Sequence, residues 1–278
     1  MTQTTLKIIT RSVVYVTLVM LGALFIFPFL WMLSTSFKTS AEVFNWPPNL
    51  IPRVWDFTNY PSAMTYLPFD LYFKNTIIYA VLAVIGTVFS CTLVAYGFSK
   101  IRFIGRDKLF ILVLATMMLP GQVKMIPTYI LFAKIRWVGS FLPLIVPTFF
   151  GSAFFIFMLR QFFLTIPYEL SEAARIDGCS EFRIYSSIIL PLARPAVATV
   201  ALFRFMDAWN DFTGPLIYLT KQTMYTVTVG LSQFVGMHGT KWGMLMAAAT
   251  VVTAPIVILF FFTQKTFIEG IATTGLKG

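Results

Sequence analysis

The sequence predicts an all-α integral membrane protein with six transmembrane helices, and three observations support this prediction. Hydrophobic residues make up 58% of the 278-residue chain and charged residues only 12%, whereas soluble domains contain about 45–50% and about 25%. The mean hydropathy is +0.79. The apolar residues also gather in stretches of about 20 residues, the length that a helix needs to cross a bilayer. A soluble enzyme is therefore a poor hypothesis.

The predicted spans belong to a single domain over residues 1–278. The first apolar stretch, residues 13–33, would be about 31 Å long as a helix and matches the hydrocarbon core. Further spans are predicted at residues 75–98, 109–131, 141–159, 196–219 and 243–263. Polar residues and prolines interrupt the third and fifth of these spans, which lipid tolerates only where the polar groups face other helices or water.

The distribution of Lys and Arg predicts how the spans are oriented. Twelve of these residues fall in segments on the side of the N-terminus and seven on the opposite side, a bias that favours both termini in the cytoplasm. Residues 34–72 are then an extracytoplasmic loop, residues 160–195 a cytoplasmic loop and residues 264–278 a cytoplasmic tail. The net charge of +10 is explained by orientation rather than by affinity for nucleic acid.

The cytoplasmic loop has the start and stop signals of two short helices outside the membrane. Pro167 suits a first helical turn, and Glu172 places negative charge near the positive helix end. Gly178 can end this helix in the left-handed conformation, and Ser180 can cap a second helix that Pro191 stops. Composition alone also allows an interfacial hairpin that merely joins two spans.

The residue pattern of this loop resembles a known signature. The residues Glu172-Ala173-Ala174, Gly178, Ile188 and Leu190-Pro191 match, at every position, the EAA signature of permease subunits of bacterial ATP-binding-cassette importers. Other segments look like the carbohydrate-uptake branch of that family, and most resemble its maltose-type second permease. These segments are Phe37-Lys38 with Glu42, Asn59-Tyr60, residues 160–163, residues 209–212 and residues 275–278.

This resemblance implies a type I importer permease fold and a set of partners. These are a second permease subunit, two ATPase subunits that bind the ATP, an extracytoplasmic solute-binding protein and a sugar substrate. The location implied is the cell (inner) membrane of a bacterium or archaeon. The family's docking surface for the ATPase would correspond here to Glu172, Ala173, Ala174, Asp177 and Gly178. A weaker contact is implied for the tail, at Gly275 and Lys277, because Ile271 and Thr274 depart from the usual tail.

The fifth span carries ionisable residues on one helical face. Arg204, Asp207 and Asp211 are spaced i, i+3, i+7, and ionisable groups inside a membrane are candidates for function. One hypothesis is that the translocation path is bordered by Asp207, Trp209, Asn210 and Asp211. The other is that Arg204 pairs with Asp207 and only fastens the helix to its neighbours. The resemblance does not decide between them.

The sequence lacks the residues needed for ATP binding, metal binding or catalysis. No Gly is followed by Lys, so the chain lacks a phosphate-binding G-x-x-x-x-G-K-[ST] loop. No His, Cys and carboxylate cluster has metal-ligand spacing, and no catalytic set can be nominated. We therefore expect a permease that has no cofactor and is not an enzyme. The rival hypotheses are a transporter driven by an ion gradient and a membrane-embedded enzyme that uses Asp207 and Asp211.

Overall fold

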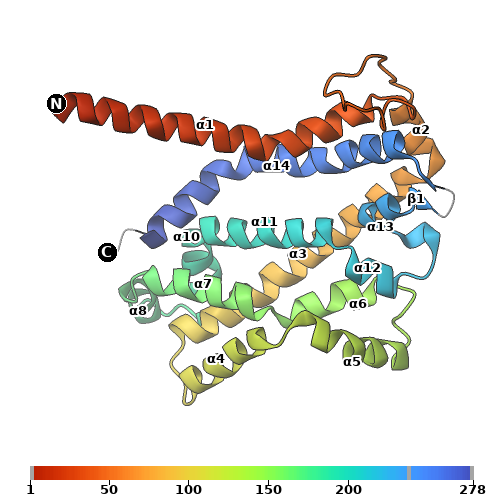
Figure 1. Ribbon diagram of the computed structural model, residues 1–278. Helices are drawn as coiled ribbons and strands as arrows, with labels where there is room; N and C mark the ends of the chain where they lie inside the picture. The colour runs from red at the N-terminus through yellow and green to blue at the C-terminus, as the bar shows by residue number, and fades with distance from the viewer. Residues whose placement is uncertain (1–2, 237–238, 276–278) are drawn as a thin grey trace. The chain divides into compact units, whose positions relative to one another are not determined.

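The computed structural model describes residues 3–236 and 239–275, and nearly all of their regular structure is helical (Figure 1). The contacts between residues divide the chain into two compact units. The first unit comprises Met1–Pro68 and Leu231–Pro255, and the second comprises Phe69–Gly230 and Ile256–Gly278. The described part of the chain is therefore all-α, apart from one pair of two-residue strands.

The first unit combines the first helix with the first part of the last one. Its elements are α1 (Gln3–Ser36), α2 (Asn59–Tyr66), the antiparallel strands β1 (Val235–Gly236) and β2 (Gly239–Thr240), and α14 (Trp242–Gly275) as far as Pro255. In the most apolar 18-residue window of α1 no residue is buried, whereas Thr35 and Ser36 at the end of the helix are buried. An exposed apolar helix of this length is suited to lipid.

The segment between α1 and α2 is held together by buried polar groups. The Lys38 side chain is buried, donates to the Asn49 carbonyl at 2.5 Å and lies over the Trp31 ring at 4.4 Å from its centroid. Glu42 accepts a hydrogen bond from the Arg53 amide at 2.7 Å. Burial lowers the pKa of the Lys38 ammonium, and the nearby Glu42 carboxylate opposes this shift. These contacts give residues 37–58 a defined fold without a helix of their own.

The second unit consists of helices and short helical turns, and it includes α14 from Ile256 onward. Its elements are α3 (Phe69–Lys100), α4 (Arg106–Ala115), η1 (Thr116–Met118), α5 (Gly121–Lys134), α6 (Leu142–Ile145), η2 (Val146–Phe150), α7 (Ala153–Thr165), α8 (Glu169–Ile176), α9 (Glu181–Ile184), η3 (Tyr185–Ile189), α10 (Leu190–Leu192), α11 (Arg194–Asn210), α12 (Thr213–Tyr218), η4 (Gln222–Met224) and α13 (Val227–Ser232).

Helix α3 is the centre of the second unit, and α7, η2 and α11 pack along it (Figure 1). Gly86 permits the contact with η2, because a Cβ there would overlap Thr148 Oγ1 and lie 2.7 Å from the Phe149 ring. One turn later, Ser90 donates to the Thr148 carbonyl at 2.9 Å. Small side chains on α3 thus allow backbones to approach closely, as in other membrane helices.

The structure contains two kinds of segment that correspond to the predicted spans, continuous helical segments and bent helix pairs. Within the described residues, four helical segments are long and apolar enough to cross a membrane: Thr10–Ser36, Phe69–Lys100, Leu142–Thr165 and Trp242–Gln264. Two further segments are bent pairs, Arg106–Met118 with Gly121–Lys134 at 96° and Glu181–Leu192 with Arg194–Asn210 at 80°. Counting each bent pair as one span gives up to six.

The fifth predicted span, residues 196–219, is not one helix. Helix α11 ends at Asn210, Asp211 is extended, and α12 begins at Thr213. A hydrogen bond at the break contributes, because the Asp211 carboxylate accepts from the Gly214 amide at 3.0 Å and so favours a new helix start. The second helix of the cytoplasmic loop also differs from the prediction, because it continues through Pro191 to Leu192 with a π-helical turn at Tyr185–Ile189.

Candidate functional site

The loop of residues 160–195 forms a helix, a tight turn and a second helix. Helix α8 has Glu169 and Glu172 in its first turn, and its chain direction changes at Gly178, whose φ is +76°. The Cys179 amide donates back to the Ala174 carbonyl at 2.9 Å, which closes the end of the helix. Ser180 Oγ then accepts from the Arg183 amide and caps α9. The expected left-handed glycine and helix cap are both confirmed.

The five residues predicted to form the docking surface do not all face the same way. Glu172, Ala173, Asp177 and Gly178 are exposed, whereas Ala174 is buried in the core of the unit. The small side chain of Ala174 therefore lets α8 lie close to its own protein. The exposed residues form an outer surface of the turn between α8 and α9, which we call the α8–α9 turn.

Two large apolar side chains of this turn were not singled out in the sequence. Ile176 is 87% exposed and Phe182 is 70% exposed. Exposed apolar side chains rimmed by polar residues are typical of protein interaction sites. The signal available in the sequence was an isolated apolar residue at each end of a polar turn, Ile176 before Asp177 and Phe182 after Glu181.

A chain of polar contacts ties the α8–α9 turn to helix α3. Arg175 Nε lies 2.6 Å from Glu181 Oε1, and Tyr96 Oη donates to Glu181 Oε2 at 2.6 Å. The Arg175 guanidinium also donates to Tyr168 Oη at 3.1 Å. Its hydrogen bond to Glu181 raises the pKa of Arg175 above its ordinary value. Arg175 therefore serves the chain's own structure and does not extend toward solvent as a free cation.

Further contacts hold the two ends of the same loop on α3. The ammonium of the buried Lys100 donates to the Ile166 carbonyl at 2.6 Å, just before α8. Thr92 and Tyr185 are joined through their hydroxyl oxygens at 2.8 Å, just after α9. Arg102 covers one face of the Tyr168 ring, with its guanidinium carbon 4.9 Å from the centroid. The loop and the end of α3 therefore form one packed body.

The four residues nominated for a translocation path have different environments. Trp209 is 2% exposed and stacks on Phe205, with the ring centroids 5.4 Å apart. Asp211 accepts from Tyr79 Oη at 2.9 Å, and its backbone carbonyl accepts from Thr228 at 2.7 Å. Asp207 and Asn210 are exposed. The structure thus separates two residues that are engaged in packing from two that are accessible.

A cavity of about 420 Å³ lies between α3, α6, η2, α7, α11 and α12. Its polar lining residues are Tyr79, Thr87, Thr148, Ser152, Arg204, Asp207, Asp211 and Tyr218. Arg204 Nε is buried and has no hydrogen-bond partner in the part of the chain that the structure describes. No ion pair within 4.0 Å joins Arg204 to Asp207 among the described residues.

The predicted tail contact is only partly visible. Gly275 is the last residue of α14. Lys277 lies outside the described residues.

Comparisons with known proteins agree with one another. Residues 92–272 match the family described as binding-protein-dependent transport system inner membrane component. The chain is 34% identical over 264 residues to the arabinooligosaccharides transport system permease protein AraQ of Bacillus subtilis, covering 93% of each chain. It is 33% identical over 277 residues to the trehalose/maltose transport system permease protein MalG of Thermococcus litoralis, covering 98% of this chain and 99% of that protein.

The fold is also found in a solved structure. A chain of a bacterial ABC transporter involved in the import of the acidic polysaccharide alginate superposes with a TM-score of 0.83 at 24% sequence identity. The superposition covers 95% of this chain and 98% of that chain. The two chains therefore share a fold.

Proposed function

Because the chain belongs to the family of binding-protein-dependent transport system inner membrane components, we propose that it is a permease subunit of an ATP-driven sugar importer. It would act with a second permease subunit, two ATPase subunits and an extracytoplasmic solute-binding protein. The sugar class is supported by the names of relatives, which include transporters of arabinooligosaccharides and of trehalose and maltose. The complex would lie in the cell (inner) membrane of a bacterium or archaeon, with both termini of this chain in the cytoplasm.

The attachment of the α8–α9 turn to α3 is the observation that supports a role in coupling the ATPase to the membrane helices. In the proposed mechanism, Glu172, Ala173, Asp177 and Gly178 contact an ATPase subunit, while Ile176 and Phe182 supply apolar contact area. Movement of that subunit on ATP binding pulls the turn. Because Glu181 joins the turn to Tyr96, the pull reaches α3 and the helices packed on it. The permease pair then changes from inward-open to outward-open, and ATP hydrolysis resets it.

We also assign roles to the translocation path and to the C-terminal tail. Asp207 and Asn210 are one helical turn apart on α11 and exposed, so their carboxylate and amide groups suit contacts with sugar hydroxyls. Trp209 and Asp211 hold the helix that presents them. The tail from Gly275, including Lys277, is proposed as a second and weaker contact with the ATPase. ATP is bound by the partner subunits, and this chain is assigned no cofactor and no catalytic residue.

Uptake by reconstituted vesicles tests the function. The chain would be co-reconstituted with its second permease and ATPase subunits, and supplied with binding protein and labelled sugar. We expect uptake to need both ATP and binding protein and to persist when ionophores abolish ion gradients. Uptake that follows an ion gradient without ATP would instead identify a secondary transporter.

A further inference from the structure

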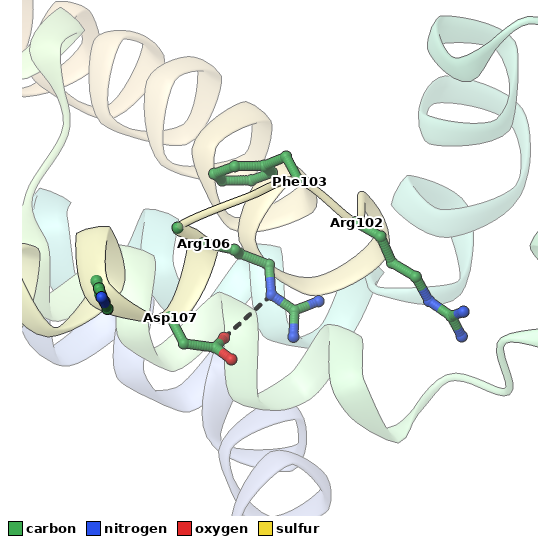
Figure 2. A pocket seen from close by; sticks show the side chains of 6 residues that line it. Arg102, Phe103, Arg106 and Asp107 are labelled. Atoms are coloured by element: carbon green, nitrogen blue, oxygen red, sulfur yellow. Dashed lines mark hydrogen bonds and ion pairs between the residues drawn. The ribbon is translucent and has the colours of Figure 1, made fainter.

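The turn between α3 and α4 combines excess positive charge with exposed apolar side chains. Between Ile101 and Lys108 there are three cations, Arg102, Arg106 and Lys108, and one anion, Asp107, so the net charge is +2. A pocket of about 390 Å³ lies among these side chains and is also lined by Phe103 and Gly105 (Figure 2). We call residues 101–108 the basic turn.

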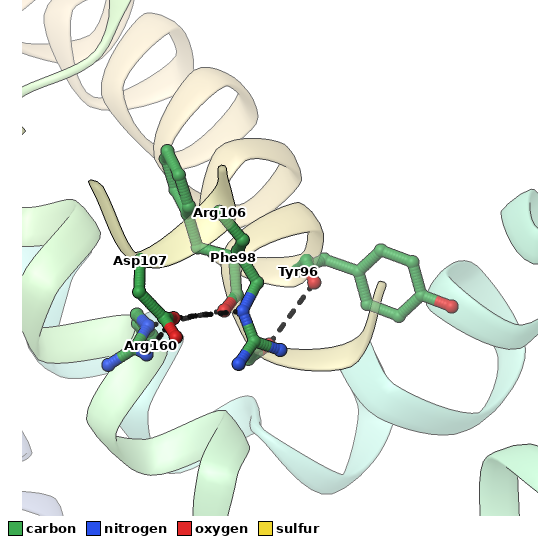
Figure 3. A network of polar contacts seen from close by, with 6 residues as sticks. Tyr96, Phe98, Arg106, Asp107 and Arg160 are labelled. Carbon is green, nitrogen blue, oxygen red and sulfur yellow. Dashed lines mark hydrogen bonds and ion pairs between the residues drawn. The ribbon is translucent and has the colours of Figure 1, made fainter. Parts of the chain in front are cut away.

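Asp107, the one anion of the basic turn, does not neutralise the three cations of that turn. Asp107 Oδ1 lies 3.1 Å from Arg106 Nε and 3.9 Å from a terminal nitrogen of Arg160, so two guanidinium groups share one carboxylate (Figure 3). Arg160 is further held by the Phe98 carbonyl at 3.2 Å. Lys108 is exposed and forms no ion pair within the described ranges. The pocket therefore has spare donors for an external anion.

The apolar side chains of the basic turn indicate where that anion comes from. Ile104 is fully exposed and Phe103 is also exposed, and both lie within four residues of the end of α3 at Lys100. Helix α4 continues from the turn with Leu109, Ile111 and Leu112 exposed. Since α3 and α4 belong to candidate spans, the turn lies at the boundary of the membrane. Exposed apolar residues flanked by cations are typical of segments that lie in the bilayer interface.

We propose that the basic turn binds the phosphate of an anionic phospholipid. Arg106, Lys108 and Arg102 contact the headgroup phosphate, and Phe103 and Ile104 insert beside the acyl chains. Clusters of Lys and Arg next to membrane helices attract anionic lipids in this way. The inference rests on the membrane placement in the proposed function. The bound lipid would lie directly beside Tyr168, which Arg102 covers, and thus beside the start of the loop that couples to the ATPase.

Lipid titration of the full-length chain in nonionic detergent tests this site without ATP or sugar. Bound phosphatidylglycerol and phosphatidylcholine would be measured by native mass spectrometry for the natural chain and for Arg106→Gln/Lys108→Gln. We expect the double variant to lose about five- to thirtyfold in apparent affinity for phosphatidylglycerol, as expected for one to two lost cations at a membrane surface. Affinity for phosphatidylcholine should be unchanged. Lys108→Gln alone, at an exposed position, should give part of the loss if the double variant is unstable.

A matched control removes the same charge elsewhere. Lys134→Gln/Arg136→Gln changes two exposed cations at the end of α5 and should leave phosphatidylglycerol binding within twofold of the natural chain. Equal losses in both double variants would overturn the proposal, because charge alone would then explain binding. Ile104→Ser should also weaken phosphatidylglycerol binding. Unchanged binding in that variant, or full displacement of lipid by inorganic phosphate, would identify a free-anion site and overturn the lipid assignment.

These outcomes are separate from those of the transport assay. A chain that transports sugar with ATP but shows no preference for phosphatidylglycerol would refute the lipid site alone. A chain that binds phosphatidylglycerol selectively but takes up sugar without ATP would refute the proposed function alone.

Discussion

Arg175 Nε lies 2.6 Å from Glu181 Oε1, and this ion pair joins helix α8 to helix α9 across the turn at Gly178. Tyr96 of α3 donates to the other carboxylate oxygen of Glu181 at 2.6 Å. A carboxylate with both oxygens engaged fixes the direction of the turn relative to α3. In the proposed mechanism, the same three residues transmit the movement of the ATPase to the membrane helices.

Arg175→Gln is expected to impair coupling more than stability. The pair is partly exposed, and such pairs contribute about 0.2–1 kcal/mol to the free energy of unfolding. Without the guanidinium, however, the turn loses its orientation, so sugar uptake per ATP hydrolysed should fall. Arg183→Gln is a matched control, because Arg183 is an exposed cation on α9 whose side chain has no ion pair among the described residues. Equal coupling ratios in the two variants would contradict the role of Arg175.

Gly178→Val is expected to weaken docking of the ATPase through the backbone. A Cβ at this position would meet no atom within 4 Å, so the penalty comes from the φ of +76° alone. Side chains other than Gly cost about 1–2 kcal/mol in the left-handed region, and Asn tolerates it best. Copurification with the ATPase subunit should therefore fall for Gly178→Val and be largely retained for Gly178→Asn. Normal copurification and transport by the Val variant would show that the α8–α9 turn is wrongly assigned.

Ile176→Ser is expected to reduce affinity for the ATPase without unfolding the chain. Ile176 is 87% exposed, so its loss leaves no cavity, whereas burial of such a side chain in an interface is worth about 1.5–3 kcal/mol. The dissociation constant should rise roughly ten- to a hundredfold, as measured by binding of the purified ATPase to the permease in detergent. Ile176→Val keeps most of the apolar surface and should bind nearly normally. An unchanged dissociation constant for Ile176→Ser would place this residue outside the interface.

The turn between α8 and α9 could be predicted from the sequence because its signals are local. A left-handed glycine and a serine cap act within a few residues, and Gly178 and Ser180 adopt the predicted roles. The contact of Tyr96 with Glu181 joins residues 85 positions apart, and nothing in either segment alone specifies it. The break after α11 was missed for the same reason, since Asp211 is fixed partly by Tyr79, 132 positions away.

Gly86→Ala is expected to destabilise the second unit. The added Cβ would overlap Thr148 Oγ1 and crowd the Phe149 ring, and overpacking of this kind costs about 1–3 kcal/mol. Gly97→Ala is the matched control on the same helix, because a Cβ at Gly97 meets nothing within 4 Å. Thermal unfolding in detergent should show a lower midpoint for Gly86→Ala only. If both variants unfold at the same temperature, α3 and η2 are not in close contact.

Replacing Asp211 or Asp207 by Asn should affect different properties of the protein. Asp211→Asn leaves one oxygen to serve both Tyr79 Oη and the Gly214 amide, and both hydrogen bonds are partly buried. Leaving such a polar group without its partner costs about 1–3 kcal/mol. Asp207 is exposed, so Asp207→Asn should change stability by less than about 0.5 kcal/mol. Its effect should appear instead in the initial rate of sugar uptake, because the path loses a charged acceptor for hydroxyl groups. Thermal unfolding and uptake measured on both variants separate these roles. A destabilised Asp207→Asn with normal uptake per folded protein would make Asp207 a packing residue and remove it from the path.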